Sequence, residues 1–246
     1  VGNAVSLDID QMNTRGREAV SMYYSIAIDG PAGAGKSTIA KEIAKKIHFI
    51  YVDTGAMYRA IALYFLREGI DGHDTERISE ECPKIRVTLG YDGEGRQQVF
   101  LNGENVTPFI RTEEVGKMAS LTAAIPAVRA ALLDLQRDMA RTSNILMDGR
   151  DIGTNVLPDA SLKIYLTASS AVRAKRRFDE LKAKGTDCDF AQIERDIIER
   201  DKQDMEREIA PLKKAEDAVL VDSSELSIDE VVDKVIAEYN KIILPE

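Results

Sequence analysis

The residues that most directly suggest chemistry form a glycine-rich loop near the start of the chain. Residues 30–37 read Gly-Pro-Ala-Gly-Ala-Gly-Lys-Ser, which matches the pattern G-x-x-x-x-G-K-S/T in full. Glycines let successive backbone N–H groups turn toward one anion, and the start of the following helix adds the positive end of its dipole. In such a loop Lys36 reaches the β- and γ-phosphates of a nucleotide, and the Ser37 hydroxyl can bind Mg²⁺. The pattern therefore predicts a nucleotide site formed by Gly30, Pro31, Ala32, Gly33, Ala34, Gly35, Lys36, Ser37 and Thr38.

Two further segments place charged side chains where they could meet this loop. Asp53-Thr-Gly-Ala-Met-Tyr-Arg59 and Asp148-Gly-Arg-Asp151 each follow a short apolar run that is typical of a strand. Ligands bind at the carboxyl ends of the strands in an open parallel sheet, so we expect both segments to face the loop. Asp148 is then placed to hold a water on Mg²⁺, and Arg59 and Arg150 can fork onto a second phosphate. Singly, Asp148 could cap a turn and each arginine could form a surface ion pair. Together, the two arginines favour an acceptor that is itself a phosphate.

Strands and helices alternate along most of the chain. Short apolar runs predict strands at residues 24–29, 49–52, 145–148, 162–167 and 218–222. Residues that recur every three or four positions predict helices that begin near Lys36, at Asp53 or Thr54, at Pro126, and at Ser169, Asp189 and Ser227. This alternation indicates an α/β fold with a parallel sheet and helices on both faces.

One segment interrupts the alternation. Residues 85–89 and 98–101 alternate like antiparallel strands, and Asn102-Gly103 is a strong tight-turn signal. We therefore expect a small antiparallel insert at residues 70–122, within a core formed by residues 22–69 and 123–246. Residues 1–21 are polar and weakly patterned, and we expect them to form a disordered tail.

Composition limits the classes of partner. The chain has 246 residues, with 33 Lys and Arg against 42 Asp and Glu, and its net charge of −9 argues against a non-specific nucleic-acid binder. Its longest apolar run, Ala60–Leu66, is far shorter than the roughly 20 residues of a membrane span. Only Cys82 and Cys188 occur, which suggests a reducing compartment. We therefore expect a cytoplasmic protein without nucleic-acid or membrane partners, and a monomer because no apolar stripe is left over.

Further motifs make the chain resemble the bacterial cytidylate kinase family. Besides the three segments above, the resemblance rests on Ile110-Arg-Thr112, Ile152-Gly-Thr154, Pro158-Asp-Ala160 and Glu199-Arg-Asp201 to Ala210-Pro-Leu212. It extends from about Met22 to the C-terminus. It implies a P-loop NTPase fold with a five-stranded parallel core, a nucleoside-monophosphate (NMP)-binding insert and a short lid near residues 170–210. The implied reaction transfers a phosphoryl group from ATP to CMP or dCMP, with Mg²⁺.

The resemblance also assigns roles to single residues. It implies that the monophosphate is bound by Asp53, Thr54, Tyr58, Arg59, Arg111, Ser120, Arg129, Arg150, Asp151, Arg200, Asp204 and Arg207. Within this set, the phosphate would contact Arg59, Arg111 and Arg150, the base would contact Ser120, Arg129 and Asp151, and the ribose and neighbouring phosphate would contact Arg200, Asp204 and Arg207. The catalytic set would be Lys36, Arg150, Arg173 and Arg177, and the metal set Ser37 and Asp148. Thr54 stands where the family often has serine, a change that keeps the hydroxyl.

The implied base site agrees with the chemistry of cytosine. Cytosine offers an amino donor next to a ring acceptor, and uracil reverses both. The carboxylate of Asp151 and the hydroxyl of Ser120 suit the amino group, and the guanidinium of Arg129 suits the acceptors. From the sequence alone, Arg129 could equally be an exposed helix residue. Arg200, Asp204 and Arg207, at spacings of four and three, share one helical face that could simply be a solvated salt-bridged surface.

Two other functions remain open at this point. The first is a phosphate-loop kinase for another acceptor, such as UMP. The second is a nucleotide sensor that binds ATP without turnover, although a sensor has little use for a complete acceptor site. A GTPase is disfavoured because the chain lacks an N-K-x-D tetrapeptide.

Overall fold

The computed structural model describes residues 23–244, so the segment 1–21 lies outside the described part. Its centre is a five-stranded sheet in the order β2-β6-β1-β7-β8, and every neighbouring pair is parallel. The strands are β1 (Ser25–Asp29), β2 (Ile50–Asp53), β6 (Ile145–Gly149), β7 (Leu162–Thr167) and β8 (Val219–Asp222). The predicted parallel sheet is confirmed, and the strand ends differ from the predicted ends by at most one residue. All five strands therefore end at one edge of the sheet, where the predicted chemistry also lies.

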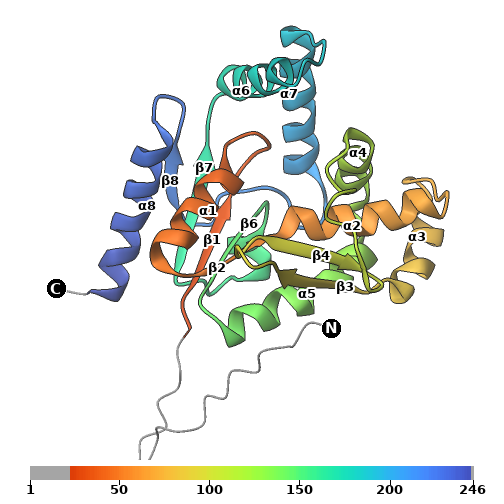
Figure 1. Ribbon diagram of the computed structural model, residues 1–246, viewed down its shortest axis with the longest axis horizontal. Helices are drawn as coiled ribbons and strands as arrows, with labels where there is room; N and C mark the ends of the chain where they lie inside the picture. Colours follow the sequence, from red (N-terminus) through yellow and green to blue (C-terminus); the bar gives the residue numbers. More distant parts are fainter. Residues whose placement is uncertain (1–22, 245–246) are drawn as a thin grey trace, which may run out of the picture.

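Helices cover both faces of this sheet (Figure 1). Ile26 and Ile28 of β1 pack in one apolar cluster with α1 (Lys36–Ile47) and α8 (Ile228–Ile243). Ala27, between them, belongs to a second cluster with α2 (Thr54–Arg67) and α5 (Pro126–Thr142). This alternation explains why the strands are apolar throughout, because successive side chains enter opposite cores. Each fully buried isoleucine contributes about 1.5–3 kcal/mol.

The predicted antiparallel insert is present, but it contains more than a sheet. Strands β3 (Val87–Tyr91), β4 (Gln97–Leu101) and β5 (Glu104–Asn105) form it, and Asn102 and Gly103 turn between the last two with φ of 49° and 90°. Helix α3 (Thr75–Glu81) precedes these strands in the chain and α4 (Glu113–Thr122) follows them, and neither helix was predicted from the sequence. Buried side chains of the insert join the same apolar cluster as α2 and α5, so the insert shares the core of that face.

Helices α6 (Ser170–Ala183) and α7 (Phe190–Glu206) form a hairpin at one end of the molecule (Figure 1). The side chains of Asp201 and Asp204 in α7 are buried. The expectation that Arg207 shares the α7 face is wrong, because α7 ends at Glu206 and Arg207 is extended, with φ −60° and ψ 138°. Within residues 23–244 no single helix is long and apolar enough to span a membrane, and only the bent pair of α4 and α5 reaches that length and composition together.

Candidate active site

The phosphate loop connects the end of β1 to the start of α1. Gly33 and Gly35 have φ of 75° and 89°, a conformation that glycine adopts at little cost. A side chain at Gly30 would place its Cβ only 1.9 Å from the backbone oxygen of Leu166 on β7. The Lys36 amine folds back over the loop and donates to the Pro31 carbonyl at 2.7 Å. Burial lowers the pKa of Lys36 to about 7, and the nearby charge of Arg150 acts in the same direction. Three carboxylates, Asp148, Asp29 and Asp204, act against this shift, and a bound polyphosphate would add to their effect.

Ser37 and Asp148 lie next to each other beside the loop. The Ser37 hydroxyl donates to Asp148 Oδ2 at 2.8 Å, and the Tyr51 hydroxyl donates to Oδ1 at 2.8 Å. Burial raises the pKa of Asp148, and the charge of Asp53 adds to the effect. Two oxygen ligands in a buried, negatively charged position suit a hard cation such as Mg²⁺. Among residues 23–244 there is no cluster of three or more Asp, Glu, His or Cys side chains able to hold a metal, so phosphates and water would complete the shell.

Three arginine side chains from distant segments come together around Asp53 and Asp204, and Asp53 is a charged neighbour of Asp148. Arg59 and Arg111 both donate to Asp53 Oδ2, at 3.1 and 2.6 Å, and Arg150 Nε donates to Asp204 Oδ2 at 2.8 Å. Burial opposes ionisation of Asp53, but the two guanidinium groups more than offset it and hold its pKa below the usual range.

Two half-buried arginines have buried donors that are unused. The Nε atoms of Arg59 and Arg200 are buried without a hydrogen-bond partner in the described part of the chain. Burial lowers the pKa of Arg200, and the charges of Arg150 and Arg59 lower it further. Buried, unpaired donors are costly, which indicates that an anionic ligand belongs in this region.

The predicted base-reading residues also lie together. Asp151 is 4% exposed and forms ion pairs with Arg129 and, at 3.5 Å, with Arg207. Arg129 stacks over the ring of Tyr58 at 5.6 Å, and both side chains line a pocket of about 230 Å³. Together these groups can offer a flat ligand hydrogen-bond acceptors from the carboxylate and donors from the two guanidinium groups.

Three arginines of α6 occupy different environments. Arg173 is buried and donates to the Ala32 carbonyl of the phosphate loop at 2.9 Å, while its other end pairs with Asp201 at 2.5 Å. Arg177, predicted to act with it, is exposed and pairs with Glu180 at 2.8 Å. Arg176, which was left out of the predicted site, instead donates to the Ser223 carbonyl at 2.7 Å and to the loop carbonyl of Ala34 at 3.5 Å. The structure therefore brings Arg173 and Arg176 to the loop.

Two predicted substrate residues do not join this network. The Thr54 hydroxyl donates to the backbone oxygen of Asp148 at 2.7 Å, so it ties the start of α2 to the end of β6. Ser120 is half-buried on α4, and the hydrogen bonds of the described residues do not connect it to Asp151.

Sequence reasoning missed several residues that support the site. Gln97 of β4 holds Asp53 by both backbone groups, with its amide oxygen 2.9 Å from the nitrogen and its amide nitrogen 3.3 Å from the oxygen. Tyr51 was also missed. Asp29 carried a signal, because it is the last residue of a strand and directly precedes the loop. Gln97 carried none, because its role depends on how the insert docks on β2.

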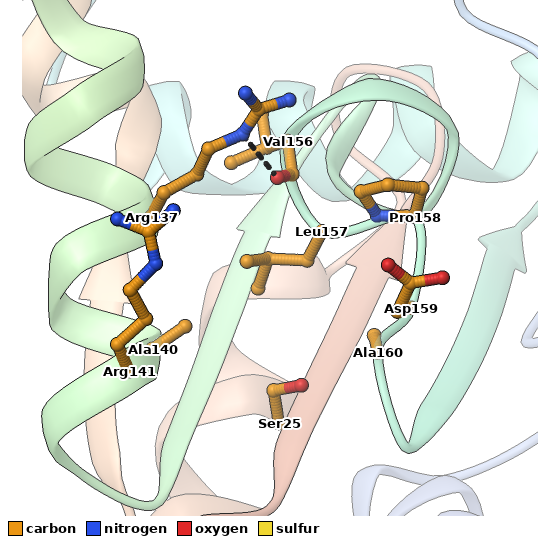
Figure 2. Close-up of a pocket in the computed structure, with 9 residues that line it drawn as sticks. All are labelled: Ser25, Arg137, Ala140, Arg141, Val156, Leu157, Pro158, Asp159 and Ala160. Atoms are coloured by element: carbon orange, nitrogen blue, oxygen red, sulfur yellow. Dashed lines mark hydrogen bonds between the residues drawn. The ribbon is translucent and has the colours of Figure 1, made fainter.

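A second pocket, of about 390 Å³, lies at the opposite end of the sheet near the first residue of β1 (Figure 2). Its arginines already have partners. Arg137 donates to the carbonyls of Val156 and Asn155 at 3.1 and 2.9 Å, and Arg141 pairs with Asp138. This pocket lacks the buried unpaired donors found at the carboxyl edge of the sheet, so the chemistry belongs to that edge.

A phosphate loop at the carboxyl edge of a five-stranded parallel sheet, with an arginine-rich anion site beside it, defines a P-loop kinase. A family model described as cytidylate kinase matches residues 26–241. The chain belongs to the cytidylate kinase family.

Relatives and solved structures agree with this placement. The chain is 50% identical to a cytidylate kinase of Caldicellulosiruptor bescii, over 90% of this chain and 98% of the relative. It is 48% identical to a cytidylate kinase of Bacteroides fragilis, over 89% of this chain and 97% of the relative. A crystal structure of an uncharacterized protein from Eubacterium ventriosum shares the fold, with a TM-score of 0.50 and 11% identity over 88% of this chain and 98% of that chain.

Proposed function

We propose that this protein transfers the γ-phosphoryl group of ATP to CMP or dCMP and forms ADP with CDP or dCDP. The observation that carries the proposal is Asp151, buried between Arg129 and Arg207 and close to the arginine-rich phosphate region. The family and the names of its relatives support the same reaction.

In the proposed reaction an oxygen of the CMP phosphate attacks the γ-phosphorus of ATP. The new P–O bond forms as the bond to the β-phosphate oxygen breaks, and ADP leaves. The attacking oxygen is already anionic, so the step needs alignment and charge neutralisation rather than a general base. Lys36 would neutralise the donor phosphates and Arg150 the transferred group, while Arg173 would exchange its bond to Ala32 for a phosphate oxygen.

Arg59, Arg111 and Arg150 would hold the acceptor phosphate. Their present partners, Asp53 and Asp204, keep the guanidinium groups in position. The unused Nε donors of Arg59 and Arg200 would complete the phosphate contacts. Charge-assisted pairs of this kind are about twice as strong as neutral hydrogen bonds.

Cytosine would be recognised through its hydrogen-bonding edge. Asp151 accepts from the amino group, and Arg129 donates to the ring acceptor. Uracil would place an acceptor against the carboxylate and a donor against the guanidinium. Because these protein groups are buried, a mismatched base leaves them unpaired, which costs about 1–3 kcal/mol for each group.

Mg²⁺ would be held by Ser37 and Asp148, with the phosphates of ATP supplying further oxygens. Bound there, the ion supplies charge neutralisation for the β- and γ-phosphates. Tyr51 fixes one oxygen of Asp148 and leaves the carboxylate oriented toward the loop. The remaining expectations are that residues 170–210 act as a lid, that residues 70–122 bind the acceptor, and that the protein works as a cytoplasmic monomer without nucleic-acid or membrane partners.

A panel of acceptors tests the proposal. ATP and Mg²⁺ are incubated with CMP, dCMP, UMP or AMP, and the diphosphates are separated by chromatography, with Lys36→Met as the blank. We expect CDP and dCDP to form, and we expect kcat/KM for CMP and for dCMP to be at least tenfold higher than kcat/KM for UMP. A preference for UMP would instead assign another monophosphate kinase, and ATP binding without any diphosphate would indicate a nucleotide sensor.

A further inference from the structure

Asp29 is a buried carboxylate that the proposed reaction does not use. It is the last residue of β1 and directly precedes Gly30, the first residue of the phosphate loop. It is 4% exposed. Its Oδ1 accepts from the backbone N–H of Ile152 at 2.8 Å, and its Oδ2 accepts from the N–H of Gly153 at 2.7 Å. One side chain therefore accepts hydrogen bonds from two successive backbone N–H groups, the first of them 123 positions away in sequence.

The two amides that it holds directly follow Arg150 and Asp151. These two residues are the phosphate ligand and the base reader of the proposed function. They follow β6 and precede a π-helical turn at Ile152–Val156, and Asp151, directly before this turn, has φ −143° and ψ 28°. Because Asp29 fixes the first two amides of this turn, it sets where the chain places both preceding side chains.

We propose that Asp29 is a positioning residue that fixes the acceptor-binding loop against the phosphate loop. The inference rests on the proposed function and deepens it. Asp29 joins the donor side through its peptide bond to Gly30 and the acceptor side through two hydrogen bonds. A small rotation of its carboxylate would therefore move the acceptor relative to the donor, and phosphoryl transfer depends on that alignment.

The chemistry of the site explains why the residue is an aspartate. Two parallel N–H donors need two acceptor oxygens on one group, and only a carboxylate supplies them. An asparagine would turn its NH₂ group toward one of the two N–H groups, so one hydrogen bond would become a repulsive contact.

The charge at Asp29 is expensive to keep. Asp151, Lys36, Lys163 and Tyr165 surround it, from the acceptor loop, the phosphate loop and β7. Burial raises the pKa of Asp29 to about 6, although the two amides and Lys36 act against this shift. Because burial destabilises the charged form of Asp29, its presence is better explained by the orientation it gives to the acceptor-binding loop than by a gain in stability of the fold.

Asp29→Asn in the full chain is the direct test. We expect the KM for CMP to rise about tenfold, the preference for CMP over UMP to fall about fivefold, and the KM for ATP to stay within twofold. A purely structural role would not separate the two substrates in this way. Ile145→Val is the control: it lies buried at the opposite end of β6, and its loss of stability should leave both KM values and the preference unchanged.

Gly153→Ala reaches the same junction from the other side. Its Cβ would lie 3.4 Å from Asp29 Oδ2 and 3.1 Å from Lys163 Cδ, so the loop must shift slightly. We expect the KM for CMP to rise about threefold, again without a change for ATP. If Asp29→Asn does not fold, this variant decides the question.

The outcomes separate the two proposals. A wild-type enzyme without a preference for CMP would reject the proposed function itself. A wild-type enzyme that prefers CMP, together with variants whose KM for CMP and base preference are unchanged, would reject only the role of Asp29. Equal losses for ATP and CMP would also reject it, because they would indicate a general loss of structure.

Discussion

The donor and acceptor halves of the cleft are built in opposite ways. The phosphate loop is one run of residues, 30–37, and it offers mainly backbone N–H groups and one lysine. The proposed acceptor half is formed by side chains from β2, α2, α5 and α7 and from the turns after β5, β6 and α7. A backbone anion site is encoded locally, in glycines and one turn. A side-chain site depends on how distant elements pack, and it can discriminate between bases as backbone donors cannot.

The largest effect is expected on the donor half. Lys36→Met should lower kcat about 10³-fold, because it removes a positive charge next to the transferred group. The fold should be kept or stabilised, since the variant also removes a buried charge whose pKa burial lowers to about 7. Single-turnover CDP formation and urea unfolding measure the two quantities. Full activity in this variant would mean that the loop does not hold the reacting phosphates.

Asp29, which joins the donor and acceptor halves, should affect how the free energy of unfolding depends on pH. The folded pKa of Asp29 is about 6, above the unfolded value of 3.8, so its contribution is present below pH 4 and is lost as the pH rises through 6. Asn cannot titrate. From pH 4.5 to 7.5 the unfolding free energy of the wild type should therefore fall by about 2 kcal/mol relative to Asp29→Asn. Urea unfolding of both proteins at several pH values tests this. A pH-independent difference would show that Asp29 titrates normally.

A smaller effect is expected for base recognition. Asp151→Asn should lower the preference for CMP over UMP about tenfold, because the amide can donate to the uracil oxygen as readily as it accepts from cytosine. The KM for ATP should not change, which would sharpen the distinction between the two halves. Competition between CMP and UMP in one reaction measures the ratio directly. Asp138→Asn, an exposed carboxylate paired only with Arg141, is the matched control.

The smallest effect is expected at Tyr51. Tyr51→Phe removes one hydrogen bond to Asp148 and leaves the ring in place, so the Mg²⁺ concentration for half-maximal rate should rise about threefold. Calorimetric titration of the complex of the protein and ATP with Mg²⁺ should show the same shift in Mg²⁺ affinity without turnover. An unchanged Mg²⁺ affinity would contradict the orienting role of Tyr51.

The sequence predicted the sheet and the donor half well because both depend on local patterns. Continuous apolar runs located all five strands, and the spacing of Gly30 to Ser37 located the loop. The acceptor residues were assigned by resemblance, and the geometry brings most of them together. The environments of Arg173, Arg176 and Arg177 could not be predicted, because neighbouring positions on a helix surface look alike in sequence. Helices α3 and α4 were missed because the strand signals of the insert dominated their segment.

The ion pairs of Asp53 with Arg59 and Arg111 have a consequence for the kinetics of binding. These guanidinium groups are already oriented by a carboxylate, so an arriving phosphomonoester would not have to order mobile side chains. The entropy of fixing them was lost when the chain folded. Capture of the nucleotide would therefore need little rearrangement of these side chains, and Asp53 would keep both arginines in place when the diphosphate departs.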